Sequence, residues 1–188
     1  DLYDNPDDKL GASQWLIANA VKPHDLLGYG TSRPDIVGAK LKAWLTHAAK
    51  HLANMNIVVE DIADPDNRIR LSNNKDATGA RLAHTTHNLG AATNKLWNTR
   101  VTQSEEIMRA AGATEVWHGP QAPMHIMGGT VMGNDPSQSV TDSYGRVHDT
   151  DNLYVAGPSL FPGTGAVNPT FTMSALASRQ ADFLSRKP

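Results

Sequence analysis

The chain has 188 residues, of which 39% are hydrophobic and 19% are charged, a length that fits one domain or pieces of two. Its 17 basic residues are outnumbered by 19 acidic ones, and no basic cluster offsets the net charge of −2. We therefore expect no nucleic-acid partner. The absence of cysteine excludes disulfides and thiolate metal sites but leaves the cellular compartment undecided.

No apolar run approaches the roughly 18 residues that a membrane-spanning helix needs, so we expect no membrane span. The first residues, 1–6, are polar and do not form a signal peptide. Because the chain begins without methionine, we interpret it as a processed chain or the back part of a longer one. Residues 1–35 are rich in Asp, Asn, Gly and Pro, which predicts irregular structure wrapped on something larger.

Pro34-Asp35 leads into a helix that we expect to end near residue 54. Its apolar residues recur at three and four positions and form one stripe: Val37, Leu41, Trp44, Leu45, Ala48, Leu52 and Met55. The next segment alternates strand and turn signals, which predicts an antiparallel hairpin. In order these are a strand at 57–61, a turn at 64–67, a strand at 68–72, a hairpin loop at 73–79 and a return strand at 81–87.

A second helix is expected from about residue 90 to 111, with Gly112 as its C-terminal cap. The residues predicted to be buried on it are Trp97, Val101, Met108 and Ala111. From about residue 120 glycine becomes frequent, and loops join short apolar pieces. A last helix is predicted after Asn168, with Pro169 at its first position. Its apolar stripe consists of Met173, Leu176, Ala177, Ala181 and Leu184.

His125 stands in the block Met124-His125-Ile126-Met127-Gly128-Gly129, which joins a titratable ring to paired glycines. Imidazole side chains titrate near neutral pH, so His125 is a candidate base for the proton of a hydroxyl group. The alternative is a structural histidine beside a glycine turn. Gly128 and Gly129 either let the backbone approach a ligand or a neighbouring strand closely, or they form a tight turn.

The segment Asn168-Pro169-Thr170 predicts a helix start whose free backbone N–H groups point beyond the helix end. Such a positive end stabilises negative charge, and the Asn168 amide can bind a substrate oxygen. A base such as His125 together with this helix start forms a plausible site for the oxidation of an alcohol. The alternatives are a plain helix N-cap for Asn168 and an ordinary buried helix start for Pro169 and Thr170.

Two further patterns are too weak to carry a function. His84 and His87 are three residues apart in the predicted return strand, where odd spacing places them on opposite faces, so no metal site is expected. Gly28-Tyr29-Gly30 imitates the start of a dinucleotide-binding fingerprint but lacks its third glycine and a preceding strand. No complete fingerprint of this kind is present in the 188 residues.

From Val59 to Leu184 the chain resembles the C-terminal part of the glucose-methanol-choline family of flavin-dependent oxidoreductases. The matching blocks follow the family's order. They are Glu60-Asp61, 65–71, 110–113, 125–133, Asp135-Pro136, 139–142, 146–148, 151–155, Phe161-Pro162 and Asn168-Pro169-Thr170 with its helix. The His-x-Met-Gly-Gly block and the Asn-Pro-Thr ending are most similar to those of bacterial sugar and polyol dehydrogenases and pyranose oxidases.

The resemblance implies an α+β fold in which an antiparallel sheet with flanking helices forms a substrate-binding domain. Residues 1–35 would be the wrapping segment, 36–120 part of the substrate-binding domain, and 121–188 a return to the FAD-binding domain with the catalytic residues. The family's dinucleotide fingerprint is expected before Asp1. The segment 121–188 would therefore complete an FAD-binding α/β domain whose other part is supplied by another chain or by missing N-terminal sequence.

The cofactor that the resemblance implies is FAD. The reaction is oxidation of an alcohol group of a sugar, polyol or related compound by hydride transfer to flavin N5, with His125 taking the proton and Asn168 orienting the oxygen. Gly157 and Ser159 would approach the ribityl or phosphate region of FAD. The flavin ring would be approached by Asn168, Pro169 and Thr170.

The expected partners are the small-molecule alcohol or sugar, a companion chain that carries the N-terminal FAD-binding sequence, and an electron acceptor. The acceptor can be oxygen, a quinone or a cytochrome-type protein, and the bacterial cytoplasm and periplasm both stay open as compartments. The alternative function is non-enzymatic. In that case the chain is a partner-binding subunit that completes another chain's flavin site without chemistry of its own.

Overall fold

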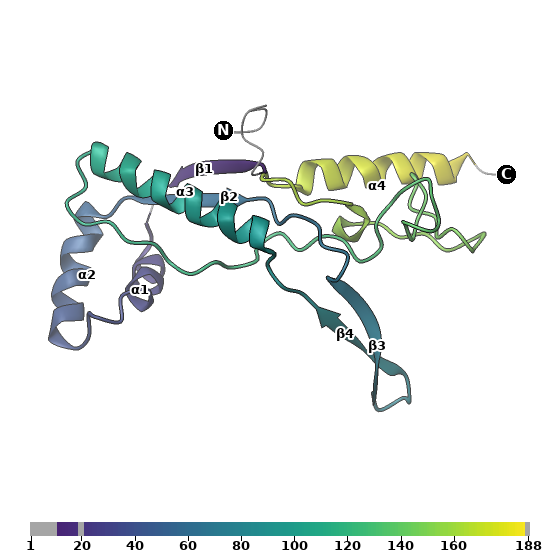
Figure 1. Ribbon diagram of the computed structural model, residues 1–188, viewed down its shortest axis with the longest axis horizontal. Coiled ribbons are helices and arrows are strands. Elements are labelled where there is room, and N and C mark those ends of the chain that lie inside the picture. The colour runs from purple at the N-terminus through teal and green to yellow at the C-terminus, as the bar shows by residue number, and fades with distance from the viewer. Residues whose placement is uncertain (1–10, 19–20, 187–188) are drawn as a thin grey trace. The chain divides into compact units, whose positions relative to one another are not determined.

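The computed structural model describes residues 11–18 and 21–186, and Figure 1 labels its elements. The polar start for which we predict no signal peptide lies at residues 1–6, outside the described residues. The chain forms two compact units, and each is described by itself. The first falls within residues 1–59 and 95–122, and the second within 60–94 and 123–188.

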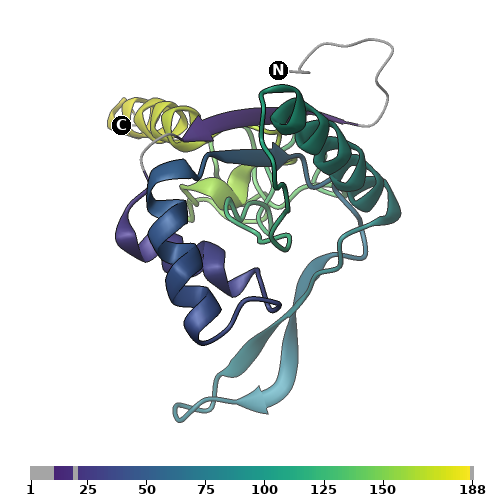
Figure 2. The ribbon, with the colours of Figure 1, turned by 90° about the vertical axis from the view of Figure 1, so that its left-hand side faces the viewer.

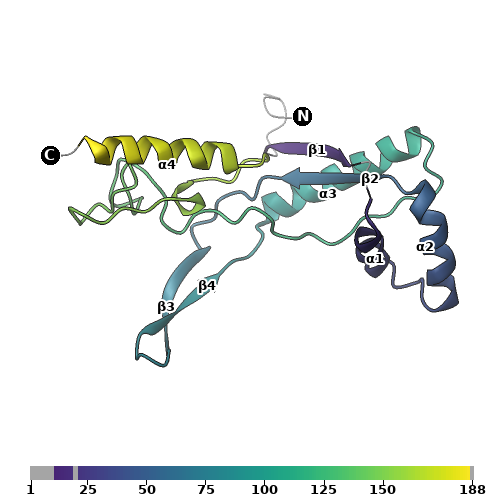
Figure 3. The same ribbon diagram turned by 180° about the vertical axis from the view of Figure 1, so that it is seen from behind.

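The first unit contains a two-stranded antiparallel sheet. Strand β1 (Ser13–Ala18) pairs with β2 (Asn54–Val59), from Ser13 opposite Val59 to Ala18 opposite Asn54 (Figure 3). Two polar contacts join β1 to helix α3 (Ala91–Ala110) within this unit. Trp15 Nε1 donates to Ser104 Oγ at 2.6 Å, and the buried Arg100 donates from Nε to Ser13 Oγ at 2.8 Å.

The buried face of α3 differs from the apolar stripe predicted for it. Its buried residues are Thr93, Leu96, Arg100, Val101 and Ser104. Of the four predicted residues only Val101 is among them. Leu96 is apolar but lies outside the predicted stripe, and the other three buried residues are polar. Polar side chains are buried here because their hydrogen bonds replace those that they would make to water.

The C-terminal end of α3 is as predicted. Gly112 has a φ of 96°, a region that favours glycine. Its N–H donates to the Arg109 carbonyl at 2.9 Å, and the Ala113 N–H donates to the Met108 carbonyl at 3.0 Å. These two bonds form a Schellman motif, which satisfies carbonyl groups that the helix end would otherwise leave unpaired.

The prediction of irregular structure for residues 1–35 is wrong over 13–18 and 23–31, where β1 and helix α1 (Pro23–Thr31) lie. The partner of β1 is β2, which follows tens of residues later, so a local pattern does not reveal the pairing. Helix α1 begins with Pro23 in its first turn, and the Lys22 N–H donates to Asp25 Oδ2 at 2.8 Å.

Gly28 and Gly30 lie in the last turns of α1 rather than in a loop after a strand. Strand β1 does precede this helix, contrary to our expectation, but a phosphate-binding loop needs its glycines at the N-terminal end of a helix. Gly30 instead permits the close approach of α1 to α2 (Ala39–His51), which lies beside it (Figure 2). A Cβ at Gly30 would lie 3.4 Å from Leu41 Cδ1.

The helix predicted from Pro34-Asp35 to about residue 54 is present as α2 but is shorter. Gly38 has a φ of 60°, which does not fit a right-handed helix, so α2 begins at Ala39. Val37, expected in the apolar stripe, therefore lies outside the helix and is exposed. Strand β2 begins at Asn54, three residues before the predicted strand at 57–61.

The second unit contains the predicted antiparallel hairpin, which is confirmed. Strand β3 (Arg68–Lys75) pairs with β4 (Arg81–Thr86), and its register shifts between Leu71 and Lys75 (Figure 2). Asp76 Oδ1 closes the turn by accepting hydrogen bonds from the Thr78 hydroxyl and from the N–H groups of Thr78 and Ala80. These bonds hold the pKa of Asp76 below its ordinary value.

Residues 123–169 are mostly loops joined by short bridges, with one 3₁₀ turn, η1 (Pro158–Leu160). Helix α4 (Thr170–Ser185) follows. The described elements are thus helices and two small antiparallel sheets, which confirms the α+β class. In the described part, no helix combines the length and apolar character needed to cross a bilayer. The assignment of 36–120 and 121–188 to two functional domains stays a prediction.

Candidate functional site

His125 lies half-buried in the second unit, in a loop whose neighbouring side chains point to solvent. Met124 is 81% exposed and Ile126 is 78% exposed. Among the described residues, none makes a hydrogen bond to the His125 ring. Both ring nitrogens are therefore available for a proton or a ligand, as a general base requires.

The segment that follows His125 pairs with the segment that carries Gly157 and Ser159. Three backbone N–H groups donate in succession: Gly128 to Pro158 O at 3.2 Å, Thr130 to Ser159 O at 3.1 Å, and Met132 to Leu160 O at 2.9 Å. The Thr130 hydroxyl also donates to Ser159 Oγ at 2.8 Å. The structure thus brings the histidine block beside the two predicted cofactor-binding positions, although they are about thirty positions apart in the sequence.

The close approach proposed for the paired glycines is present at Gly129. Gly128 and Gly129 have φ angles of 80° and 101°, which other residues rarely adopt. A Cβ at Gly129 would lie 3.2 Å from Ile69 Cδ1, so this glycine also lets a neighbouring strand approach closely. The positive φ angles and the close approach together explain why glycine is needed here.

Gly157 offers open backbone at the end of the same pairing. Its φ is 114°, and a Cβ built on it would meet no heavy atom within 4 Å. The open space is what a flat or phosphate-bearing ligand needs to approach a main chain closely. The FAD contact at Gly157 and Ser159 that the family resemblance implies stays a prediction.

The start of α4 differs slightly from the prediction. Pro169, expected at the first helical position, is the N-cap, and the helix begins at Thr170. The Pro169 carbonyl accepts the first intrahelical hydrogen bond, from Met173 N–H at 2.9 Å. No side-chain hydrogen bond caps this helix in the described residues, so the alternative of Asn168 as a side-chain cap is wrong.

Among the described residues, no side chain bonds the N–H groups of the first turn of α4. Its leading N–H groups have no intrahelical partner, as in any α-helix, and Asn168 before them is exposed. Phe171 in the same turn is 91% exposed. These features fit a negatively charged or carbonyl-bearing group beyond the helix end. No hydrogen bond of the described residues joins Asn168 to His125, so the convergence of these two side chains stays a prediction.

A hollow of about 360 Å³ lies in the second unit beside Gly129, between the start of β3 and the segment around Val140. Arg68, Ile69 and Gln138 contribute to its wall. Neither His125 nor Asn168 lines it. We therefore do not assign the substrate to this hollow.

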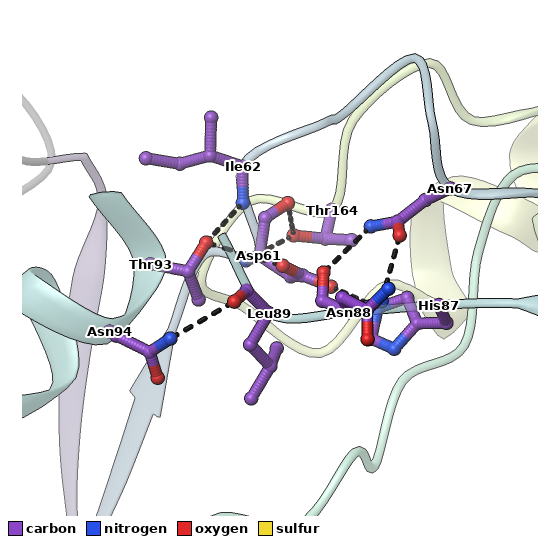
Figure 4. Close-up of polar contacts among 9 residues, drawn as sticks. All are labelled: Asp61, Ile62, Asn67, His87, Asn88, Leu89, Thr93, Asn94 and Thr164. Atoms are coloured by element: carbon purple, nitrogen blue, oxygen red, sulfur yellow. Dashed lines mark hydrogen bonds and ion pairs between the residues drawn. The ribbon is translucent and has the colours of Figure 1, made fainter. Parts of the chain in front are cut away.

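Sequence reasoning missed a network of polar contacts centred on Asp61 (Figure 4). Asp61 Oδ2 lies 2.7 Å from His87 Nε2, and Asp61 Oδ1 accepts from the Thr93 hydroxyl at 3.3 Å. Thr164 contacts the main chain of Asp61 from the segment that leads to Asn168. Asp61 is part of the Glu60-Asp61 block of the resemblance, but no local pattern shows that Thr164 contacts it.

The comparisons with known proteins identify the family of this chain. The family model described as GMC oxidoreductase, which covers the C-terminal part of such enzymes, matches residues 39–177. The fructose dehydrogenase large subunit of Gluconobacter japonicus is 36% identical over 150 residues, which are 78% of this chain and 28% of that protein. Paromamine 6'-oxidase of Streptomyces fradiae is 33% identical over 128 residues, 66% of this chain and 24% of that protein.

A third relative, 2-methyl-1,2-propanediol dehydrogenase of Mycolicibacterium austroafricanum, is 40% identical over 96 residues, 49% of this chain and 17% of that protein. By name, all three relatives are oxidoreductases. The chain belongs to the GMC oxidoreductase family, whose members are typically flavin-dependent. It spans about a quarter of the length of the first two relatives, 28% and 24%.

Proposed function

We propose that this chain is the C-terminal part of an FAD-dependent enzyme that oxidises an alcohol group of a sugar, polyol or related compound. The observation that supports the proposal best is the pairing of residues 128–132 with 158–160. His125 lies three residues before this pairing, and Gly157, with open backbone, lies directly before it on the other side. Among the described residues, His125 has no hydrogen-bond partner. Alcohol oxidation needs a proton acceptor and a hydride acceptor; the histidine would supply the first, and FAD held at the open main chain would supply the second.

His125 acts as the general base in this proposal. Its imidazole accepts the hydroxyl proton while the carbon loses hydride, and a base of this kind contributes roughly 10²–10⁴-fold to the rate. Asn168 donates a hydrogen bond from its side-chain amide to the substrate oxygen. The role requires the exposed Asn168 side chain and the His125 ring to face the same substrate.

The residues that would hold FAD are Gly157, Ser159, Asn168, Pro169 and Thr170. The open backbone at Gly157 and the hydroxyl of Ser159 suit the ribityl or phosphate region. The uncapped start of α4 would stabilise negative charge near the flavin ring, with a contribution of up to about 2 kcal/mol when such a helix end is partly buried. The chemistry that FAD supplies when bound is acceptance of the hydride at flavin N5.

The rest of the flavin site would come from companion sequence, in another chain or in an N-terminal part of the same protein. The chain lacks a dinucleotide-binding fingerprint, and α4 buries none of its described residues. One relative is named as a large subunit, which supports a multi-subunit arrangement for this chain as well. Electrons would then pass to oxygen, a quinone or a cytochrome-type protein.

The test is flavin reduction in the FAD-loaded protein that contains this chain. Under anaerobic conditions, a panel of sugars and polyols is mixed with the protein, and the flavin absorbance is followed. We expect at least one of them to bleach the flavin. In His125→Ala we expect the rate of bleaching to fall by roughly 10²–10⁴-fold while FAD stays bound.

His118→Ala is the matched control, because His118 is an exposed loop histidine that pairs with Glu105. It should leave the rate unchanged. A normal rate in His125→Ala would show that the base is another group. A colourless protein that no alcohol affects would instead favour the non-enzymatic, partner-binding alternative.

A further inference from the structure

The side chain of Thr164 joins the segment that ends at Asn168 to Asp61 of the same unit by hydrogen bonds. The Thr164 hydroxyl accepts a hydrogen bond from the Asp61 N–H at 3.0 Å and donates one to the Asp61 carbonyl at 3.3 Å. One hydroxyl thus satisfies both main-chain groups of the same residue. A contact of this kind fixes the position of the Thr164 backbone relative to Asp61 in two directions.

Asp61 is itself fixed by residues from two other elements (Figure 4). Thr93, which is 2% exposed, lies in the first turn of α3; its hydroxyl donates to Asp61 Oδ1 at 3.3 Å and accepts from the Ile62 N–H at 3.1 Å. His87, directly after β4, lies 2.7 Å from Asp61 Oδ2. The anchor for Thr164 is therefore rigid, because a helix start and the base of a hairpin both contact it.

Asn168 is only four residues after Thr164, so the hydrogen bonds of Thr164 also restrain the position of Asn168. Gly165 has a φ of 60°, which turns the chain sharply, and Ala166 is fully buried. The exposed Asn168 follows two residues later and is directly succeeded by Pro169, whose ring restricts the backbone before α4. Asn168 is thus exposed at its side chain but restrained on both sides along the main chain.

We propose that Thr164 and Asp61 are positioning residues for Asn168. They do not touch the substrate; they set the place at which the Asn168 amide meets the alcohol oxygen. The proposal rests on the proposed function, because it assigns a purpose to the position of Asn168. Misplacement of a positioning contact by about 1 Å can lower a rate by on the order of 100-fold.

The experiment is a double-mutant cycle in the FAD-loaded protein that contains this chain. Thr164→Val keeps the shape of the side chain but loses both hydrogen bonds to Asp61, and Thr164→Ser keeps the hydroxyl. We expect Thr164→Val to lower the rate of flavin reduction at saturating alcohol by roughly 10- to 100-fold, and Thr164→Ser to restore it. In an Asn168→Ala background, Thr164→Val should change the rate by less than about 2-fold, because its effect passes through Asn168.

Thr150→Val is the matched control, since it also removes a hydrogen bond from a threonine hydroxyl to a main-chain carbonyl of the second unit, that of Val147. Thr164→Ala replaces Thr164→Val in the cycle if the valine variant does not accumulate. A second readout needs no flavin chemistry: hydrogen exchange of the Asp61 amide, which donates to the Thr164 hydroxyl, should accelerate in Thr164→Val and not in Thr150→Val.

Two results overturn the inference alone. The first applies when alcohol reduces the flavin of the unmodified protein. It is a loss in the rate of flavin reduction from Thr164→Val that is equally large with Asn168 and with Asn168→Ala. The other is unchanged hydrogen exchange of the Asp61 amide in Thr164→Val. If no alcohol reduces the flavin of the unmodified protein, the proposed function fails, and the inference fails with it.

Discussion

Helices α3 and α4 both carry apolar residues at helical spacing, but only α3 is covered by its own chain. Five residues of α3 are buried, and the polar ones among them are hydrogen-bonded to β1 or to the segment after β2. Helix α4 buries none of its described residues. Helix stability in proteins comes mostly from packing of an apolar face. The apolar stripe of α4 therefore contributes less packing than the buried face of α3 among the described residues.

The contacts that hold α4 in the chain lie on one side and are largely polar. Gln180 Nε2 donates to the carbonyls of Tyr144 and Val155, at 2.8 and 2.9 Å. The Phe183 ring stacks on Tyr144 with a centroid distance of 4.2 Å. Among the described residues, α3 therefore has a buried face and α4 has only half-buried and exposed side chains.

The largest expected effect comes from the same substitution made in both helices. Leu96 of α3 is fully buried, and Leu184 of α4 is 38% exposed. We expect Leu96→Ala to lower the free energy of unfolding by about 2–5 kcal/mol, because it removes buried contacts and leaves a cavity. Leu184→Ala should cost less than about 1 kcal/mol. Urea denaturation of both variants measures the difference.

A loss in Leu184→Ala as large as that in Leu96→Ala would contradict the comparison. It would mean that α4 is packed within this chain as firmly as α3. The same pair of variants, measured in the presence of the companion sequence, sharpens the argument. There the cost of Leu184→Ala should rise, whereas that of Leu96→Ala should not.

Local periodicity predicted the elements whose signals are long and self-contained. The hairpin of β3 and β4, the span of α3 and the glycine cap at Gly112 follow from patterns within a few residues. Strand β1 was missed because its short apolar run becomes a strand only when β2 pairs with it. The polar buried face of α3 was missed because hydrophobic periodicity carries no information on buried Arg100.

The candidate site shows the same limit. Residue chemistry and the family resemblance pointed to His125 and Asn168, because a histidine beside glycines and an Asn-Pro-Thr helix start are visible in the sequence. The hydrogen bonds between Thr164 and Asp61 join residues 103 positions apart, and a lone threonine between glycines gives no local signal. Contacts of this kind depend on the folded arrangement and need a structure.

A smaller effect is expected from the polar contacts of α3. Arg100 is 1% exposed and donates from Nε to Ser13 Oγ, whereas Arg109 on the same helix is exposed and pairs with Glu105. Arg100→Ala should lower the free energy of unfolding by about 1–3 kcal/mol, because Ser13 loses its partner in a buried site. Arg109→Ala should cost less than about 0.5 kcal/mol. Equal losses in the two variants would show that burial of Arg100 adds nothing to the stability of α3.

The smallest effect is expected at the turn on which α4 rests. Burial raises the pKa of Asp142, but hydrogen bonds from the N–H groups of Tyr144 and Arg146 and from the Arg146 side chain outweigh it and leave the pKa below its ordinary value. A carboxyl group with a lowered folded pKa stabilises the fold at pH values above its unfolded pKa. This contribution is lost as the pH falls through the folded pKa.

Asp142→Asn should therefore reduce the dependence of stability on pH in the acidic range, by less than about 1 kcal/mol because the side chain is partly exposed. Thermal unfolding between neutral and acidic pH measures the change, with Asp151→Asn, an exposed aspartate of the same loop region, as control. Because Tyr144 in this turn accepts a hydrogen bond from Gln180, acid should also loosen α4 while α3 keeps its contacts. Hydrogen exchange of the two helices at acidic pH tests this difference. Equal acceleration in α3 and α4 would show that α4, held by one polar turn, is no more sensitive to acid than α3, held by a buried face.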